Sequence, residues 1–343
     1  MISLERLDFV LAQAPLLTIG LLGDLFLDRY LEIDADAREV SIETDLEAYQ
    51  VARVRNSPGA LGTVLNNLAA LGVGRLVPVS VVGDDGEAYD LLKQLVTLPV
   101  DTRAVIRDRR RQTPTYTKPL MPTADGEWRE LNRLDLRTRG PLSEATQQQL
   151  REALDDVFDN TAGLIVLDQV NEEGWGAVTP AVRDHLAVLA RRDPDKLIFV
   201  DSRAHIDRFR SGVLKPNAHE CLRAAKESGI NSEDPRAAAE TMSRTRGLPL
   251  FCTLGPEGIL FAEPDAPATL VPTPPVSDPV DIVGAGDSAT AGIVTALMAG
   301  ATSIEAAAVG NLVASVTIRK LGTTGTASPA ELTARWEADY SPA

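Results

Sequence analysis

The sequence has 343 residues, of which 44% are hydrophobic and 24% are charged, and its formal net charge is −15. This length suits one large α/β domain or two smaller ones, and the composition is typical of a globular protein. The acidic balance argues against nucleic acid or an anionic membrane as a main partner, so an anionic substrate would require a local cluster of Arg and Lys.

Two features point to the compartment. The two cysteines, Cys221 and Cys252, cannot form a disulfide framework, which indicates a reducing environment. The sequence shows no signal-type segment and no run of about 18 apolar residues. We therefore expect a cytoplasmic protein.

The first part of the chain predicts a mixture of buried and exposed elements. Residues 16–23 form an apolar run closed by Gly-Asp, which is typical of a buried strand. Later apolar patterns predict a helix over 61–71, a strand over 76–82 and a helix over 87–97. Two polar segments, 31–56 and 103–135, predict short exposed strands that join in a small lid sheet.

From residue 143 onward, strands and helices alternate. The expected helices cover 143–158, 177–191, 218–228, 234–246, 286–299 and 303–319. The expected strands cover 163–168, 196–201, 213–215, 249–254 and 258–262. This alternation predicts a mostly parallel sheet with helices on both faces.

Ligands bind such sheets beyond the carboxyl ends of the strands, and polar residues follow several of the expected strands. These residues are Asp24, Asp168, Asp201, Asn217, Thr253 and Asp287. Each one alone is compatible with a turn or a cap, but together they line one edge of the sheet.

The stretch Gly284-Ala285-Gly286-Asp287 precedes an apolar segment that predicts a buried helix. Three small residues let backbone N–H groups point into a common space at the positive end of that helix, where an anion binds. A carboxylate beside a bound anion is unfavourable unless it has a task, such as accepting the proton of an attacking hydroxyl.

Two other interpretations of this stretch stay open. Asp287 is compatible with a plain helix N-cap. The spacing Gly284-x-Gly286-x-x-Ala289, with Glu305 further on, also fits a dinucleotide fingerprint. That fingerprint belongs in the first βαβ unit of a domain, whereas this one lies late in the sequence. A dinucleotide-dependent oxidoreductase is therefore the weaker alternative.

Five motifs in order give the sequence a family resemblance. They are Gly23-Asp24-Leu25-Phe26-Leu27-Asp28-Arg29-Tyr30, Asn217-Ala218-His219-Glu220, Thr253-Leu254-Gly255-Pro256-Glu257-Gly258, Asp281-Ile282-Val283-Gly284-Ala285-Gly286-Asp287 and Lys320-Leu321-Gly322-Thr323. With them the chain resembles the PfkB (ribokinase-like) sugar kinases, most closely the kinase part of the bifunctional ADP-heptose proteins. A Walker-type Gly-x-x-x-x-Gly-Lys-Ser/Thr loop does not occur in the sequence.

The resemblance implies one kinase domain over 1–343, with a three-layer ribokinase-like α/β fold and lid segments at about 31–56 and 103–135. Because the sequence ends at Ala343, we expect no nucleotidyltransferase activity. In relatives the lid also pairs two subunits, so a homodimer through the lid is expected.

The resemblance also implies roles on the nucleotide side. Asp287 would be the catalytic base, and the amides of Gly284, Ala285 and Gly286 would hold the transferred phosphoryl group of ATP. Asn217 and Glu220 would organise Mg²⁺, largely through water. The remaining nucleotide-binding positions would be Thr253, Gly255, Gly258 and Asn311. Asp281 is the implied site for a monovalent cation such as K⁺.

On the acceptor side, Asp24 and Asp28 would accept hydrogen bonds from sugar hydroxyls, near Gly59 and Thr63. Lys118 and Arg133 would supply cationic contacts to an acceptor phosphate, although ordinary exposed lid charge explains both equally well.

Departures from the family pattern gather on that same side. Ala60 stands for a glycine and Thr63 for an asparagine, while Val283 stands for a threonine beside the phosphates. A lysine of the heptose subfamily is missing near Asp168. We therefore predict an ATP- and Mg²⁺-dependent kinase of a sugar or sugar phosphate, whose acceptor differs from the usual heptose phosphate. A nucleotide- or sugar-binding protein without turnover is the alternative on the same fold.

Overall fold

A computed structural model describes residues 2–277, 279–322 and 324–340. Its central feature is a nine-stranded sheet. In spatial order the strands are β14 (Ala266–Val271), β13 (Ile259–Glu263), β12 (Leu250–Thr253), β11 (Val213–Leu214), β10 (Leu197–Ser202), β9 (Gly163–Asp168), β1 (Thr18–Gly23), β4 (Arg75–Gly83) and β5 (Val105–Asp108). The strands from β12 to β5 run parallel, and β13 and β14 are antiparallel.

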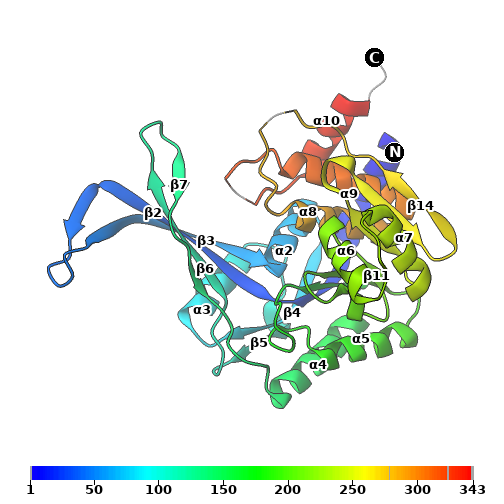
Figure 1. Ribbon diagram of the computed structural model, residues 1–343, viewed down its shortest axis with the longest axis horizontal. Coiled ribbons are helices and arrows are strands. Elements are labelled where there is room, and N and C mark those ends of the chain that lie inside the picture. The colour runs from blue at the N-terminus through cyan, green and yellow to red at the C-terminus, as the bar shows by residue number, and fades with distance from the viewer. Residues whose placement is uncertain (1, 278, 323, 341–343) are drawn as a thin grey trace.

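Helices cover both faces of this sheet (Figure 1). One layer holds α1 (Leu4–Gln13), α2 (Leu61–Ala70), α3 (Gly86–Leu95), α8 (Ala285–Met298), α9 (Ser303–Thr317) and α10 (Pro329–Tyr340). The other holds α4 (Glu144–Asp159), α5 (Pro180–Arg192), α6 (Ala218–Glu227) and α7 (Pro235–Arg246). Strand side chains alternate between the two cores, since Ile165 packs in the first and Leu164 in the second. The predicted three-layer α/β sandwich with a mostly parallel sheet is confirmed.

Three elements escaped the sequence analysis: α1, β14 and α10. The strand β14 lies at the sheet edge with alternating partial exposure, so its apolar signal is weak. The two helices pack against each other, and the Trp336 indole donates a hydrogen bond to the Ile2 carbonyl at 3.0 Å. Short helices at the ends of a chain depend on such tertiary contacts more than on propensity.

A second sheet extends from the body (Figure 1). It contains β3 (Glu47–Ala60), β2 (Leu25–Val40), β6 (Thr115–Pro122) and β7 (Trp128–Glu130), with β8 (Leu134–Leu136) paired to β6. We call this sheet the lid sheet. The segments 31–56 and 103–135 thus meet as expected, except that β5 joins the large sheet instead. The strands β2 and β3 also reach further into the body than 31–56, to Leu25 and Ala60.

Ion pairs tie the lid sheet to the body. Arg29 on β2 bonds Glu87 at 3.4 Å and Asp90 at 3.0 Å, both on α3. Because Leu25 and Leu27 are fully buried or nearly so, the root of β2 belongs to the core while its tip is solvated. The lid sheet is therefore anchored at one end only.

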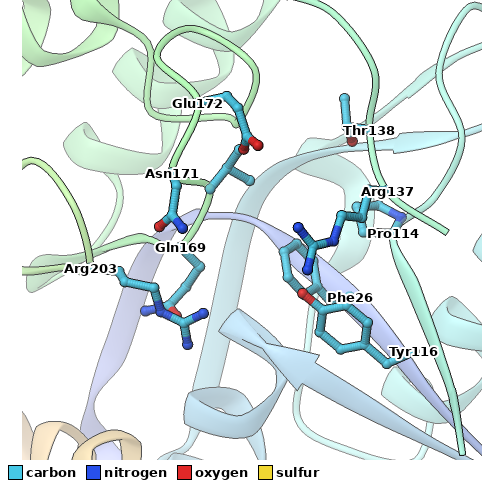
Figure 2. A pocket seen from close by; sticks show the side chains of 10 residues that line it. Phe26, Pro114, Tyr116, Arg137, Thr138, Gln169, Asn171, Glu172 and Arg203 are labelled. Carbon is cyan, nitrogen blue, oxygen red and sulfur yellow. The ribbon is translucent and has the colours of Figure 1, made fainter. Parts of the chain in front are cut away.

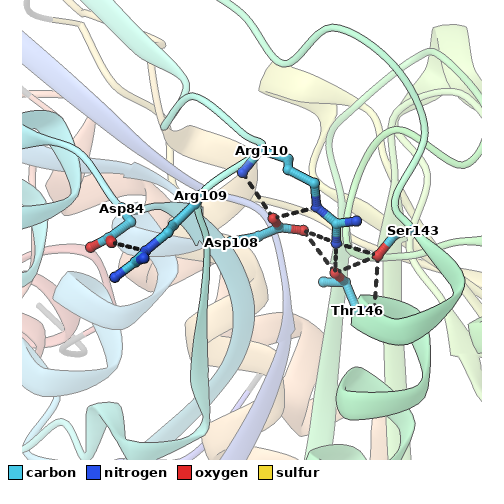
Figure 3. Close-up of polar contacts among 6 residues, drawn as sticks. All are labelled: Asp84, Asp108, Arg109, Arg110, Ser143 and Thr146. Atoms are coloured by element: carbon cyan, nitrogen blue, oxygen red, sulfur yellow. Dashed lines mark hydrogen bonds and ion pairs between the residues drawn. The ribbon is translucent and has the colours of Figure 1, made fainter.

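A polar network fixes the end of β5 (Figure 3). Arg110 bonds Asp108 at 3.2 Å and the Ser143 hydroxyl at 2.6 Å, and Thr146 donates to Asp108 at 2.7 Å. Arg109 bonds Asp84 at 3.0 Å on the other side. This network attaches the arginine-rich turn after β5 to the start of α4.

Four 3₁₀ turns complete the element list: η1 (Ala14–Leu16), η2 (Thr102–Ala104), η3 (Ile206–Arg208) and η4 (Gly255–Glu257). Across the described ranges, every helix is too short or too polar to span a lipid bilayer.

Candidate active site

The helix α8 begins at the Gly284–Asp287 stretch. Gly284 is the N-cap with φ 81°, a conformation that favours glycine, and a Cβ there would lie 3.5 Å from the Thr63 methyl carbon. A Cβ on Gly286 would meet only the Lys215 Nζ, at 3.8 Å. The protein itself therefore leaves open space over Gly286, at the positive end of the helix. Of the three predicted cradle amides, that of Ala285 is already engaged, since it donates to the Ile282 carbonyl at 3.1 Å.

Four charged residues meet beside this helix start, and we call them the inner cluster: Asp201, Lys215, Glu220 and Asp287. Lys215 is 2% exposed and its Nζ lies 2.8 Å from Asp201 Oδ2. The Thr290 hydroxyl, on α8, donates to the same Asp201 oxygen at 3.3 Å. The ends of β10 and β11 thus hold an ammonium group directly beneath the cradle.

The inner cluster shifts the pKa values of its members. Burial, together with the charge of Asp201, raises the pKa of Asp287 to about 7, although Lys215 and Arg203 act in the opposite direction. Burial and Asp201 likewise raise the pKa of Glu220. Burial opposes the charge of Lys215, but the nearby Asp201 outweighs it and raises the Lys215 pKa. Asp287 is thereby poised to accept a proton near neutral pH.

Asn217 and Glu220 form the N-terminal capping box of α6. The Glu220 amide donates to Asn217 Oδ1 and the Asn217 amide donates to Glu220 Oε2, both at 2.9 Å. The Asn217 backbone also pairs with Thr253 at the end of β12. One oxygen of Glu220 is thus committed to the helix cap, while the carboxylate as a whole faces the charge of Asp201.

Two of the expected nucleotide positions further along the sheet, Gly258 and Asn311, meet at the Val271 carbonyl. Gly258 has φ 110°, and a Cβ there would lie 2.2 Å from the Val271 carbonyl oxygen. The buried Asn311 donates its side-chain amide to the same carbonyl at 2.8 Å. Gly255, with φ 60°, starts the 3₁₀ turn that leads from β12 to β13. Glycine is required at position 258 by both conformation and space.

A separate group lies at the root of the lid sheet, and we call it the lid cluster: Asp28, Tyr30, Gly59 and Lys118. The Lys118 ammonium lies 3.0 Å from Asp28 Oδ1 and donates to the Tyr30 hydroxyl at 3.3 Å. A Cβ on Gly59 would lie 2.5 Å from Asp28 Oδ2, so glycine makes room for that carboxylate. Burial acts against the charge of Lys118, and Asp28 outweighs it to raise the Lys118 pKa.

Other predicted residues are occupied by structural contacts. The two oxygens of Asp24 accept the Ala177 amide at 2.7 Å and the Gln169 amide at 3.4 Å, which ties down the loop after β9. Burial raises the Asp24 pKa to about 6. Arg133 makes a bidentate ion pair with Asp135, at 2.7 and 2.9 Å, and its guanidinium stacks over Tyr116.

Asp281 also makes backbone contacts. Its carboxylate accepts the Val283 amide at 3.0 Å and the Gly322 amide at 3.2 Å. These bonds join the loop before α8 to the turn after α9. Thr323, the last residue of the Lys-Leu-Gly-Thr motif, lies outside the described residues.

Ala60, one of the departures from the family pattern, has φ 53° and ψ −117° as the N-cap of α2. Residues that carry a Cβ rarely adopt this backbone conformation, whereas glycine adopts it freely. An alanine at this position therefore carries a cost in its backbone conformation. The strain lies three residues before Thr63, whose methyl group lies beside Gly284.

Sequence reasoning missed Lys215 as a site residue. The sequence contained a signal for it, since Lys215 lies two residues before Asn217 and directly follows the buried strand β11. A lysine that ends a buried strand at the ligand edge of a parallel sheet is a useful signal, because it must find a carboxylate there. Among the described residues, no group of three or more His, Cys, Asp or Glu side chains is arranged to hold a metal by itself.

Comparisons with known proteins show the family and the fold. The model of the pfkB family of carbohydrate kinases matches residues 27–331. The bifunctional protein HldE of Pelobacter propionicus is 33% identical over 320 residues, which are 91% of this chain and 61% of that protein. HldE of Trichlorobacter lovleyi is 29% identical over 335 residues, or 96% of this chain and 65% of that protein. The chain thus spans somewhat less than two thirds of the length of these relatives.

Solved structures support the fold. Phosphofructokinase-2 of Escherichia coli in complex with potassium has a TM-score of 0.70 at 19% identity, and the match covers 94% of this chain and 99% of that one. Ribokinase of Thermotoga maritima has a TM-score of 0.66 at 18% identity, with the same coverage. The architecture is therefore ribokinase-like. Because the family model covers most of the chain, this protein belongs to the pfkB family of carbohydrate kinases.

Proposed function

We propose that this kinase transfers the γ-phosphate of ATP to a hydroxyl of a sugar or sugar phosphate, with Asp287 as the base. The observation that carries the proposal is the Asp287 carboxylate at the start of α8, with its pKa raised to about 7, beside an open cradle that a buried ammonium faces. A base poised near neutral pH next to an anion site is what phosphoryl transfer to an alcohol requires.

In the proposed reaction the acceptor oxygen attacks the γ-phosphorus in line with the leaving group. A new P–O bond forms to the acceptor, the bond from the γ-phosphorus to the β–γ bridging oxygen breaks, and ADP leaves. The hydroxyl proton passes to Asp287. Lys215 and the amides at the start of α8 lie where they would stabilise the negative charge of the transferred group.

The residues present fit a magnesium ion. The carboxylates of Asp201, Glu220 and Asp287 repel one another, which helps raise the pKa values of Glu220 and Asp287, but among the described residues they are not arranged to coordinate an ion directly. A hard cation with retained water ligands would relieve that repulsion, and it would neutralise phosphate charge when bound. Asn217 and Glu220 would hold it through water. For K⁺ we keep Asp281 as the candidate, although its oxygens already accept two backbone amides.

The acceptor would lie between the inner cluster and the lid cluster. Asp28 would orient a sugar hydroxyl, since only one of its oxygens is paired closely with Lys118. Closure of the lid sheet would exclude water and limit hydrolysis of ATP. The sequence resemblance to heptose kinases makes a heptose phosphate the first acceptor class to assay, and the departures at Ala60 and Thr63 motivate other sugars beside it.

We also keep the proposal of a homodimer through the lid sheet. Its distal part exposes apolar side chains, including Ile42, which is 98% exposed, and Leu46. Sedimentation analysis of the protein and of an Ile42→Ser variant tests the pairing: a monomer in both cases would contradict it.

The test of the main proposal is release of ADP from Mg·ATP with a panel of neutral and phosphorylated sugars, including heptose and hexose phosphates. We expect turnover with at least one acceptor, and a loss of about 10²–10⁴-fold in kcat for Asp287→Asn. Asp168→Asn is a poor control because Asp168 is buried. Asp265→Asn is a suitable control because Asp265 is exposed and lies in the turn between β13 and β14, at the edge of the large sheet. Binding of ATP and sugar without ADP release in any mixture would favour the binding protein instead.

A further inference from the structure

A small cavity lies between the lid sheet and the loop after β9 (Figure 2). It encloses about 80 Å³, and Phe26 and Tyr116 of the lid sheet form one wall. Gln169 and Asn171, on the loop after β9, form the other. Since a single water requires roughly 10–15 Å³, this volume suits a group of several heavy atoms rather than a whole sugar.

Two guanidinium groups face this cavity, Arg203 from the end of β10 and Arg137 from the segment after β8 (Figure 2). In the described part of the chain the Arg203 side chain has no hydrogen bond or ion pair, and it is exposed. Arg203 is also close enough to Asp287 to act against the rise of its pKa. It therefore connects the cavity to the inner cluster.

Arg137 is only loosely held. Its guanidinium has a long ion pair with Asp135, at 3.6 Å, and that carboxylate is already bonded by Arg133 on both oxygens. Glu172 is the acidic residue on the lining, so the two arginines leave the cavity with an excess of positive charge. In a chain of net charge −15, two guanidinium groups at one cavity, one with a long ion pair and one with none in the described part of the chain, favour the binding of an anion.

Neighbouring cations are not available for this task. Lys118 is neutralised by Asp28 at 3.0 Å and Arg133 by Asp135. Arg109 and Arg110 bond Asp84 and Asp108 (Figure 3). Lys118 and Arg133, the two cations predicted from the sequence, are therefore weaker candidates for binding an anion than Arg137 and Arg203.

Arg111 has a supporting place instead. It donates to the Thr138 hydroxyl at 3.1 Å and to the Trp175 carbonyl at 2.7 Å. These bonds join the segment that carries Arg137 to the loop after β9, while Asp24 holds the same loop through its amides. These hydrogen bonds therefore hold the loop after β9 in place beside the segment that carries Arg137.

We propose that this cavity binds an anionic substituent of the acceptor, a phosphate or carboxylate, through Arg137 and Arg203. The inference rests on the proposed function and deepens it by naming an acceptor that carries negative charge away from the reacting hydroxyl. Guanidinium groups suit this role because each presents parallel N–H donors to an oxyanion. Arg203 would hold the substituent at the side of the cavity nearest to Asp287, which fixes the direction in which the acceptor lies.

The experiment compares matched acceptors, each as the neutral sugar, the sugar phosphate and the corresponding sugar acid, by ADP release. We expect kcat/KM for the preferred anionic acceptor to exceed that for its neutral partner by 10²-fold or more. Arg137→Met and Arg203→Met should each raise KM for the anionic acceptor at least tenfold and leave KM for ATP within twofold. Arg139→Met is the matched control, because Arg139 is exposed in the same segment and does not line the cavity.

A binding measurement separates this inference from the kinase proposal. An acceptor phosphate that lacks the reacting hydroxyl should bind the wild type and Asp287→Asn equally in calorimetry, and should bind Arg203→Met at least tenfold more weakly. The phosphate and carboxylate arms tell the two sources of charge apart. Turnover of neutral sugars with kcat/KM equal to that of their phosphates, unchanged in both arginine variants, would overturn the inference and leave the kinase proposal standing. Anion binding without any turnover would do the reverse.

Discussion

The inner cluster and the lid cluster both pair a lysine with an aspartate, yet they differ in burial and in surroundings. In the inner cluster, Lys215 and Asp201 are 3% and 9% exposed as side chains and lie at the ends of two core strands. In the lid cluster, Lys118 and Asp28 are 16% and 15% exposed, and they belong to a sheet anchored at one end. A charge pair fixed in the core holds its geometry before any ligand arrives, whereas the pair in the lid can move with it.

The comparison indicates a division of labour. We assign the transfer of the phosphoryl group to the inner cluster, whose side chains come from the ends of two adjacent parallel strands and from the starts of α6 and α8. The proposed acceptor side combines the lid sheet, the loop after β9 and Arg203. Two of the sequence departures, Ala60 and Thr63, lie at the end of β3 and at the start of α2 beside it.

The largest effect is expected from removing the inner lysine. Lys215→Met leaves the Asp201 carboxylate buried without its partner, so we expect the free energy of unfolding to fall by about 3–5 kcal/mol. The kcat should fall by about 10²–10³-fold through loss of charge stabilisation at the cradle. Urea unfolding and ADP release measure the two quantities.

A double variant separates the two roles of Lys215. Asp201→Asn/Lys215→Met has no unpaired buried charge and should recover part of the stability but none of the turnover. If the double variant also recovered turnover, Lys215 would serve only to neutralise Asp201, and the contrast between the clusters would reduce to one of burial.

The pH profile is expected to distinguish the clusters next. Because Asp287 must be ionised to accept a proton and its pKa is about 7, kcat/KM for the acceptor should rise about tenfold per pH unit below pH 7 and level off above it. Lys215→Met removes a charge that lowers the Asp287 pKa, so the rise should move to higher pH. Lys118→Met, in the lid cluster, should change KM and leave the midpoint in place. An equal shift in both variants would contradict the assignment of Asp287.

The pH dependence of stability gives an independent check, because stability should fall over the pH range in which activity rises. The folded-state pKa of Asp287 lies above the ordinary value of 3.8, so its protonated form is favoured by folding and the contribution to stability is lost as pH rises toward 7. Asp287→Asn should therefore be more stable than the wild type at pH 8 and gain nothing at pH 4. Unfolding midpoints in urea at the two pH values provide the measurement.

Sequence reasoning predicted the large sheet well and the acceptor side poorly, for physical reasons. Buried parallel strands such as 163–168 are short apolar runs with polar residues at their ends, so a local pattern is sufficient to find them. The motif positions Asn217 and Thr253 lie at or just after such ends and are readily found, whereas Asp287 was found from the small residues that begin α8. The cavity with Arg137 and Arg203 joins residues from five separate segments, and local sequence contains no sign that they meet.

The partners of charged side chains were equally invisible. Lys118 and Arg133 have the character of free cations in the sequence, and only the fold shows that Asp28 and Asp135 neutralise them. The sequence also contained no sign that the oxygens of Asp24 accept amides of a loop about 150 residues away, at 2.7 and 3.4 Å. The burial of a carboxylate and the identity of its donors depend on tertiary packing.

The smallest effect concerns the backbone between the two clusters. Ala60→Gly should relieve the positive φ at the start of α2, which costs an alanine about 1–3 kcal/mol, while the unfolded chain gains freedom worth about 0.4–1 kcal/mol. We expect a net stabilisation of about 1 kcal/mol in urea unfolding. Ala69→Gly, within the same helix, is the control and should destabilise by about 0.5–1 kcal/mol. Because α2 also places Thr63 against Gly284, the activity of Ala60→Gly shows whether this strain is used: a more stable enzyme with lower kcat would mean that the strained N-cap positions the cradle, and unchanged kcat would mean that the alanine is merely tolerated.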